Sequence, residues 1–364
     1  EFLCSEAMFH LGVPTTRALS LVTTGEPVVR DIMYDGNPKP EPGAIVCRVA
    51  ESFLRFGSFE IHSAMGDYET LRRLVDFTLL NHFEGHDPSS DEGLVHWLNR
   101  VAETTAAMIA HWGVGFVHGV MNTDNMSIHG ITIDYGPFGW VEDYDPNWTP
   151  NTTDSNTRRY TFGNQRLVGE WNFARLLEAV SPLFEDPSNL YRSLEHYRTS
   201  FKSHTEAMWV SKLGLGQSAP GDDELVAELV SLLRVVETDM TIFFRSLGTI
   251  DGLNPLDMAH AYYDEAALPV DELGLWLGKW WSRVDGDPDR EAMNNANPKY
   301  VLRNWMSQLA IEAAEADDYS VAIELQDLLR APYEEQPSSE DRWYKKRPEW
   351  ARHKVGCSML SCSS

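Results

Sequence analysis

The chain has 364 residues, of which 43% are hydrophobic, and a formal net charge of −25 at pH 7. This length and composition allow a large buried core, in one large domain or two coupled ones. The acidic balance argues against nucleic acid as a partner, because a phosphate backbone requires clustered Lys and Arg. No apolar run approaches the roughly 20 residues that cross a membrane. The four cysteines show neither a disulfide framework nor paired metal-ligand spacing, which favours a reducing compartment.

The first predicted element is a helix over residues 2–11, apolar at positions 2, 3, 7, 8 and 11 and ended by Gly12. Glu6 is its carboxylate after the first turn, and by itself it is typical of a solvated helix face. The chain starts inside this helix without an initiator Met or a targeting segment. We therefore expect the sequence to be a fragment of a longer protein.

Two strands are predicted next, over residues 17–30 and 43–60, separated by the Pro- and Gly-rich turn DGNPKPEPG. Arg48 interrupts the apolar run of the second strand, and Arg55 follows seven residues later. An Arg between apolar strand residues favours a defined anionic partner. An edge-strand Arg, with its stem packed and its head in water, remains an equal alternative.

A helical pattern begins near residue 67, with apolar positions at steps of three and four. His82, His86 and His111 fall in this part of the chain, and their spacing is not that of a zinc site. The tryptophans, including Trp276, Trp280 and Trp281, are interpreted as packing residues. The predicted helices cover residues 68–83, 92–113, 169–184, 224–247 and 300–316.

Residues 117–139, VHGVMNTDNMSIHGITIDYGPFG, set two carboxylates and an amide around a short apolar hairpin or strand at 126–133. Asn125 and Asp134 carry hard oxygen ligands of the kind that Mg²⁺ takes from a protein, with phosphates and water completing its shell. Asp124 is left to receive a proton. Asp and Asn are also common in turns, so it is the combination that predicts a site for a metal-bound nucleotide.

The order of these residues resembles the catalytic-loop and metal-loop pair of protein-kinase-like folds, especially the HGDxxxxN form of small-molecule kinases. His118 and Asn125 keep that spacing, and an Asp-x-Gly follows at 134–136. Val120 stands where the usual base would be, and Asp124 is the carboxylate that the loop retains. The displaced base suggests a reaction other than ordinary γ-phosphoryl transfer. His118 is interpreted as a structural donor that holds the loop.

Longer stretches carry a more specific resemblance: HGVMNTDNMS followed by TIDYGPFG, with EAMFHLGVPTTRALSLV, CRVAESFLRFGSFE and NPKYVLRN elsewhere. These stretches resemble the SelO family of pseudokinase-fold proteins, and the resemblance runs over essentially the whole chain. It implies an α+β, protein-kinase-like bilobal fold. The implied activity is magnesium-dependent transfer of AMP from ATP to Ser, Thr or Tyr hydroxyls of proteins, with ATP bound in a flipped orientation.

The resemblance also implies roles for single residues. Arg48 and Arg55 would grip the terminal phosphates of the inverted ATP, and Glu6 would be the αC Glu that pairs with a phosphate-binding Lys. That Lys and the glycine-rich loop would lie upstream of residue 1, so the fragment is expected to lack full activity. Asn125 and Asp134 would hold Mg²⁺ or Mn²⁺. Asp124 would then deprotonate or orient the acceptor hydroxyl as pyrophosphate leaves.

The cysteines near the end of the chain could form a redox-active pair or remain free. SelO relatives carry a redox-active Cys or selenocysteine three residues from the end, the position of Cys362, and some bacterial members tie it to a Cys of the activation segment. Here that segment, within residues 142–165, contains no Cys. A bridge of Cys362 to Cys357, or one involving Cys4 or Cys47, and a free thiol all remain open. In the same segment Arg158 and Arg159 either bind acidic groups of a substrate or balance Asp154 and the EDYD cluster, and we favour the second slightly.

The expected domains are a partial N-lobe over 1–62, a helical C-lobe over 63–335 and a polar tail over 336–364, disordered by composition. Two other functions stay open. One is a protein or small-molecule kinase that transfers the γ-phosphate, and the other is a non-catalytic nucleotide-binding pseudokinase scaffold. The resemblance further implies a link to redox homeostasis, and it leaves a bacterial cytoplasm, a mitochondrion and a plastid equally open as the compartment.

Overall fold

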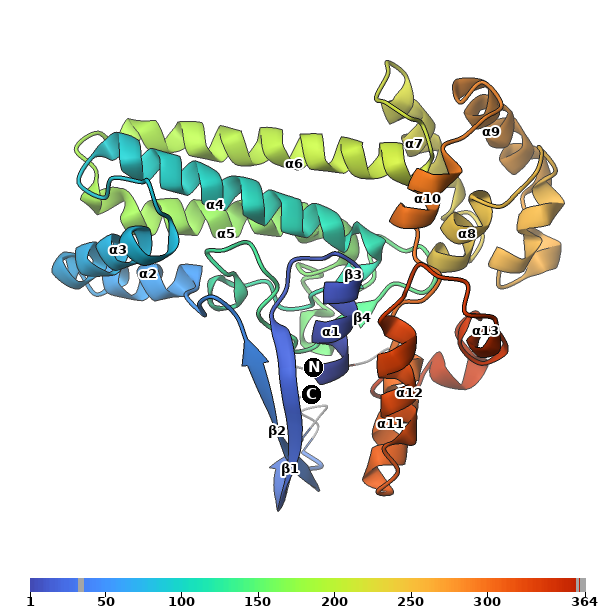
Figure 1. The fold of residues 1–364 in the computed structure, drawn as a ribbon, viewed down its shortest axis with the longest axis horizontal. Helices are drawn as coiled ribbons and strands as arrows, with labels where there is room; N and C mark the ends of the chain where they lie inside the picture. Colours follow the sequence, from blue (N-terminus) through green and yellow to red (C-terminus); the bar gives the residue numbers. More distant parts are fainter. Residues whose placement is uncertain (32–35, 358–359, 361–364) are drawn as a thin grey trace.

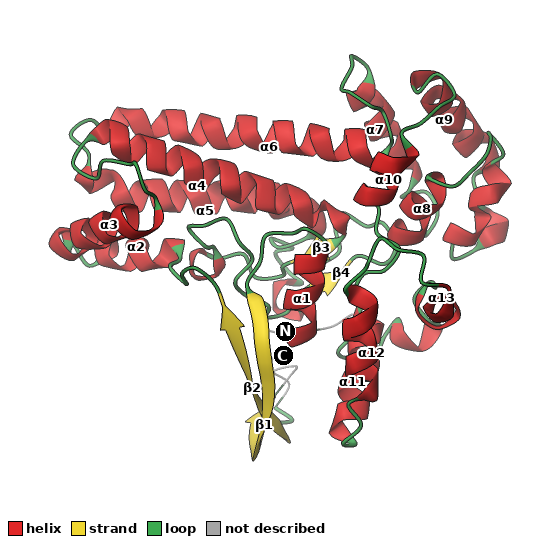
Figure 2. Cartoon of the chain, in the orientation of Figure 1, coloured by secondary structure: helices red, strands yellow, loops and turns green. Residues whose placement is uncertain are grey.

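The computed structural model describes residues 1–31, 36–357 and 360 of the chain. It is mainly helical, and the strands of the described part form two separate two-stranded antiparallel sheets (Figure 2). The predicted α+β class is therefore confirmed. The helices are α1 (Phe2–His10), α2 (Phe56–Ala64), α3 (Tyr68–His82), α4 (Asp91–His111), α5 (Gln165–Val180), α6 (Leu190–Lys212), α7 (Asp222–Leu232), α8 (Met240–Leu247), α9 (Val270–Arg283), α10 (Arg290–Ala296), α11 (Asn304–Glu315), α12 (Ser320–Leu329) and α13 (Pro337–Trp343).

The longer sheet is the hairpin of β1 (Arg17–Arg30) and β2 (Lys39–Val49), which projects from the helical body (Figure 1). Its register runs from Arg17 opposite Val49 to Arg30 opposite Lys39, with two irregularities along β1. Most of its side chains are exposed, including several large apolar ones. The first predicted strand, 17–30, is confirmed in full.

The second predicted strand, 43–60, is wrong in its later half. β2 ends at Val49, and α2 begins at Phe56. Phe56 and Phe59 are fully buried and lie three residues apart, so they share one face of a helix. Aromatic residues suggested a strand here, but the three-residue spacing of the buried pair fits only a helix.

The predicted helices over 68–83, 92–113 and 169–184 correspond to α3, α4 and α5. α4, α5 and α6 all pack against one another, and α2 and α3 lie at one end of these three helices (Figure 1). α4 starts at a Ser90 cap, whose hydroxyl accepts from Gly93 N at 3.1 Å. It then buries Leu94, Trp97, Leu98 and Val101 at helical spacing.

The predicted helix 224–247 is two helices. α7 ends at Leu232, and α8 starts at Met240 after the cap residue Asp239, whose carboxylate accepts from Ile242 N at 2.9 Å. A cap of this kind starts a new helix because it satisfies backbone donors that have no partner inside the helix. The Trp residues of α9 pack as expected. The rings of Trp276 and Trp280 stack with centroids 6.2 Å apart.

The tail is ordered over its described part, contrary to the expectation from composition. α13 lies within it, and the fully buried ring of Trp343 stacks on Trp305 of α11, with centroids 5.8 Å apart. α11 and α12 form an antiparallel pair, and α12 contacts α1 (Figure 1). Packing of Trp343 against Trp305 offsets the entropy lost when this mainly polar segment becomes ordered.

No helix in the described ranges combines the length and apolar character needed to cross a lipid bilayer.

Candidate active site

The loop after β3 (Phe116–Val117) is anchored at both ends. His118 is buried, and its backbone N donates to Oε1 of Gln165 at 3.0 Å. Its Nδ1 accepts from Val120 N at 3.4 Å. Gly119 has φ +78°, and a Cβ there would lie 2.0 Å from the carbonyl oxygen of Pro137. Only glycine fits this position, where the loop presses against the segment that follows Asp134.

Asn125 is oriented by its own loop. Its Nδ2 donates to the carbonyl oxygen of Val120 at 2.9 Å, and no hydrogen bond of its Oδ1 is found within the described ranges. Because the amide NH₂ group donates to the backbone, the amide oxygen is left as an acceptor. This is the state required of a metal ligand.

Asp124 is exposed and lies against the first turn of α2. A Cβ atom on Gly57, the second residue of that helix, would lie only 2.0 Å from Oδ1 of Asp124. The missing side chain at 57 therefore makes the space that the carboxylate occupies. The neighbouring Thr123 hydroxyl donates to Glu60 at 2.5 Å, which fixes the same loop to α2.

Asp134 ends a tight hairpin whose two sides are joined by an antiparallel bridge between Met126 and Thr132. Antiparallel pairing at these positions brings Asn125, on one side of the bridge, and Asp134, two residues beyond Thr132 on the other, to the same end of the hairpin. Burial lowers the pKa of His118, and the charge of nearby Asp134 opposes that shift. His118 is thus a neutral ring close to the Asp134 carboxylate. For this carboxylate we find no hydrogen bond to any described residue.

Arg48 and Arg55 flank this hairpin. The Arg48 guanidinium donates to the carbonyl oxygen of Ile133, directly before Asp134, and its Nε lies 3.2 Å from the Glu1 carboxylate. Arg55 is attached through its backbone, which bridges to Ser127. No ion pair of the Arg55 side chain occurs in the described part of the chain. Both predicted phosphate ligands therefore border the loop that carries Asn125 and Asp134.

Glu6 has a partner within the chain. Its carboxylate accepts two hydrogen bonds from Arg17, at 2.9 and 2.8 Å, and a third from Ala18 N at 2.8 Å. This fork joins α1 to the start of β1. The hydrogen bonds from Arg17, supported by that from Ala18, hold the pKa of Glu6 below its usual value of 4.5.

The Glu6 interaction predicts a pH-dependent contribution to stability. A carboxyl group whose folded-state pKa is lowered stabilises the fold above its unfolded pKa and loses this effect as pH falls through the folded value. We expect Glu6→Gln to reduce the free energy of unfolding at pH 7 and to approach wild type below pH 4.5, as measured by urea unfolding at several pH values. Glu103→Gln, which removes an exposed pair with Arg100, should have little effect at any pH. A Glu6→Gln deficit that stayed constant with pH would contradict this account.

The acidic cluster of the next segment has counter-charges that the sequence did not suggest. Glu142 and Asp239 both pair with Arg303, at 2.5 and 2.6 Å, and all three side chains are buried. Asp143 pairs with Arg347 of the tail at 3.1 Å. The expectation that Arg158 and Arg159 balance this cluster is therefore wrong for the pairs found here.

Asp154 binds backbone rather than guanidinium groups. Its carboxylate accepts from the backbone N of Arg159 at 2.9 Å and of Tyr160 at 2.7 Å. The Arg159 guanidinium instead lies over the Trp171 ring, 4.2 Å from its centroid. Asp154 thus shapes the turn, and Arg159 fixes it to α5.

The last described residue, Leu360, forms an isolated parallel bridge with Asn151. Its backbone N donates to Pro150 O at 2.9 Å, and Thr152 N donates to Leu360 O at 2.8 Å. Asn151, between them, donates to Gly119 O at 3.0 Å. The tail is thereby connected through one layer of residues to the candidate catalytic loop.

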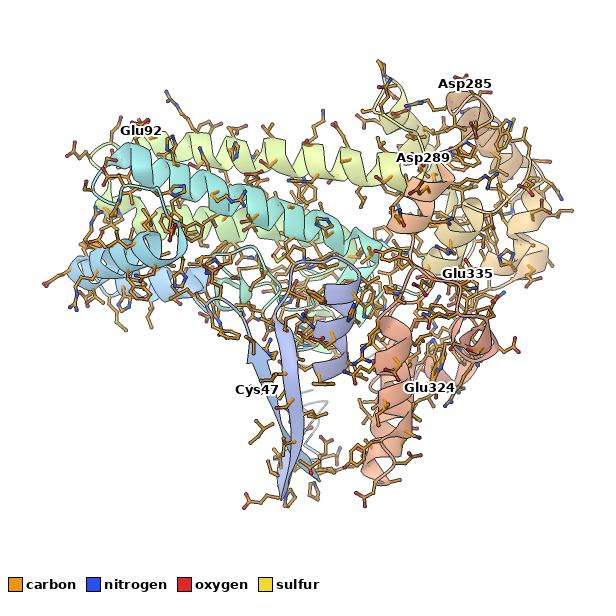
Figure 3. All side chains as sticks on the ribbon, viewed as in Figure 1. Cys47, Glu92, Asp285, Asp289, Glu324 and Glu335 are labelled. Carbon is orange, nitrogen blue, oxygen red and sulfur yellow. The ribbon has the colours of Figure 1, made fainter. Side chains whose placement is uncertain are left out.

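Cys4, Cys47 and Cys357 are not disulfide-bonded to one another. Cys47 lies on the exposed hairpin (Figure 3), whereas burial raises the pKa of the Cys357 thiol to about 11. A buried thiol with this pKa is protonated at neutral pH and reacts slowly. Cys362 lies outside the described residues, so its predicted redox role stays a prediction.

A mainly apolar groove of about 740 Å³ opens beside the metal loop. It runs from Tyr135 and Gly136 between the β1–β2 hairpin and helices α11 and α12. Volumes of this size are typical of small-molecule sites.

The structure also gathers three side chains that sequence spacing did not connect: Glu51, His82 and His129. Their candidate ligand atoms all lie within 4.8 Å of one another. The spacing of His82 from other histidines in the sequence is not that of a zinc site, because its two neighbours here come from distant segments. No sequence signal joins these three positions.

The chain was compared with known proteins. Residues 1–330 match the family described as protein adenylyltransferase SelO. The protein nucleotidyltransferase YdiU of Flavobacterium johnsoniae is 50% identical over 379 residues, an alignment that covers 100% of this chain and 72% of that relative. Proteins of the same name from Azoarcus sp. (strain BH72) and Xanthomonas axonopodis pv. citri are each 51% identical, with the same coverage. The chain therefore belongs to the SelO family of protein adenylyltransferases, as its motifs predicted.

Proposed function

We propose that the protein transfers AMP from ATP to a hydroxyl group of a Ser, Thr or Tyr side chain in other proteins. Membership of a family of protein adenylyltransferases supports this reaction. The observation that carries the proposal is the position of Asp124, the residue before Asn125, whose carboxylate fills the space left by the missing side chain of Gly57. It gives the loop a positioned carboxylate although Val120 stands at the kinase base position.

We also propose a protein-kinase-like bilobal architecture with the division 1–62, 63–335 and 336–364. The β1–β2 hairpin, which projects from the helices formed by later residues, supports it (Figure 1). α1 shares a hydrophobic cluster with α4 and α12. The proposed lobes are therefore functional regions on a partly common core.

Mg²⁺ or Mn²⁺ fits the donor set of this site. The Oδ1 of Asn125 and the carboxylate of Asp134 are hard oxygen donors without competing hydrogen bonds from the described residues. We assign both as the metal ligands. When bound, the ion would neutralise phosphate charge and align the α-phosphate with the acceptor.

The chain's own groups then have distinct tasks. Arg48 and Arg55 hold the β- and γ-phosphates, whose charge increases as pyrophosphate departs. The acceptor oxygen forms a bond to the α-phosphorus, and the bond from that phosphorus to the bridging oxygen breaks, so that the electron pair leaves with pyrophosphate. Asp124 takes the hydroxyl proton. Glu6, now bound to Arg17, is proposed as the αC carboxylate that a phosphate-binding Lys would engage.

Double labelling tests this function. A form of the protein with the flanking sequence of its relatives is incubated with a protein acceptor and with ATP labelled at either the α- or the γ-phosphate. We expect label from the α position to enter the acceptor and label from the γ position to appear in pyrophosphate. Transfer of the γ label would identify a kinase, and ATP binding without any transfer would identify a scaffold.

A further inference from the structure

Glu51, His82 and His129 converge from three elements. Glu51 lies two residues after β2, His82 is the last residue of α3, and His129 is in the turn of the hairpin at 126–132. Nδ1 of His82 lies 3.3 Å from Oε1 of Glu51. The ligand atoms of all three lie within 4.8 Å of one another.

The two imidazole rings are held by aromatic packing. The His129 ring stacks on Phe83, with centroids 5.5 Å apart and planes 4° apart. The edge of the His82 ring meets His129, with centroids 5.2 Å apart. The rings are therefore pre-positioned side by side, with a carboxylate at the same point.

This arrangement leaves one polar group unsatisfied. Nε2 of His129 is buried and has no hydrogen-bond partner. A buried nitrogen without a partner is destabilising, and a metal ion bound to it would supply the missing partner.

We propose that Glu51, His82 and His129 form a site for Zn²⁺ or a transition-metal ion of similar preference. Two imidazoles and one carboxylate are a common zinc ligand set, which leaves a fourth position for water. The Glu51 side chain is 63% exposed, so solvent reaches the ion from that side. Hard ions such as Mg²⁺ favour all-oxygen sites and would bind here poorly.

The position of the site suggests what the ion does. Glu51 precedes Arg55 by four residues, and His129 follows Asn125 by four. Between them the two segments are paired through Ile128 N to Leu54 O at 3.2 Å and Phe56 N to Met126 O at 2.9 Å. An ion bound to Glu51 and His129 would clamp this pairing and, with His82, tie it to the end of α3.

The test is a Zn²⁺ titration of the chelator-treated protein against a chromophoric chelator, with Mg²⁺ in excess to occupy sites for hard ions. We expect one equivalent to bind, and at least a tenfold loss of affinity in His82→Gln and in His129→Gln. Two controls should retain wild-type affinity: His111→Gln, an exposed histidine bonded only to its own helix, and Asp134→Asn, which alters the separate proposed magnesium site. Wild-type affinity in both histidine variants would overturn the proposal, as would the absence of a stoichiometric site.

Two further measurements cover the case in which a histidine variant fails to fold. X-ray absorption of the zinc-loaded wild type should show two imidazole ligands at about 2.0 Å. A first shell without imidazole would overturn the proposal. Zn²⁺ should also raise the thermal unfolding temperature of wild type and of His111→Gln, because binding to the folded state alone stabilises it. Glu51→Gln, which keeps an exposed side chain of the same size, should show a smaller rise.

Discussion

Replacing Asp134 with alanine is expected to abolish AMP transfer, with a loss of at least about a thousandfold. The proposed metal would lose its charged ligand, and metal stabilisation of a phosphoryl transition state contributes several kcal/mol, at about 1.4 kcal/mol for each factor of ten. The Asp134 carboxylate makes no hydrogen bond to the described residues, so its replacement should leave the fold intact. Incorporation of α-labelled ATP into an acceptor measures the effect.

The matched control for this variant is Asp145→Ala. Asp145 lies in the segment that follows the site, and its carboxylate accepts from Asn147 N at 2.8 Å in a local turn. The Asp145→Ala variant should transfer AMP at nearly the wild-type rate. Both variants should have wild-type circular dichroism. Asp134→Ala activity within a few-fold of wild type would remove Asp134 from the metal site.

Gly57→Ala is expected to reduce AMP transfer about a hundredfold while leaving stability nearly unchanged. The new Cβ would lie 2.0 Å from Oδ1 of Asp124, so the carboxylate must rotate away. That rotation costs little, because the obstructed atom is the end of an exposed side chain. A displacement of about 1 Å at a reacting group can still cost about 10²-fold in rate. The measurements are transfer rate and thermal unfolding.

Gly278→Ala separates the effect of crowding from that of helix propensity. Gly278 lies in α9, and a Cβ there has nothing within 4 Å. Gly278→Ala should gain about 0.5–1 kcal/mol of helix propensity because it lies inside a helix, and it should keep wild-type activity, whereas Gly57→Ala should lose activity. If Gly57→Ala transfers AMP normally, Asp124 does not act from the position described.

The fold could be predicted where one short-range pattern determines an element. Strand 17–30 was found in full because its β-branched residues are bounded by turn signals, and α4 because its apolar face repeats over five turns. Prediction failed where a single contact decided the outcome. Asp239 starts a new helix in the middle of an apolar run, and the buried pair of Phe56 and Phe59 turns an expected strand into α2.

The candidate site divides in the same way. The loop with Asn125 and Asp134 is contiguous, so its residue types and spacing identified it. Three other contacts join segments that are far apart in sequence. They are Asp124 against Gly57, Glu6 with Arg17, and His82 with His129. These contacts arise only from tertiary packing, which local sequence patterns do not reveal. The metal and phosphate roles of the predicted residues stay predictions until the variants above are measured.

The contacts of the tail bear on how the protein is made. Leu360 pairs with Thr152 across 208 residues, and the Tyr333 hydroxyl donates to Leu11 O across 322. Closing loops of this length is slow, and the surfaces they will cover stay open to aggregation meanwhile. On the ribosome, the contacts of the catalytic loop with Gln165 and Glu60 can form before residue 360 has been synthesised, whereas the pairing of residues 150–152 with Leu360 cannot. The tail contact is therefore added late to a loop that already has its local anchors.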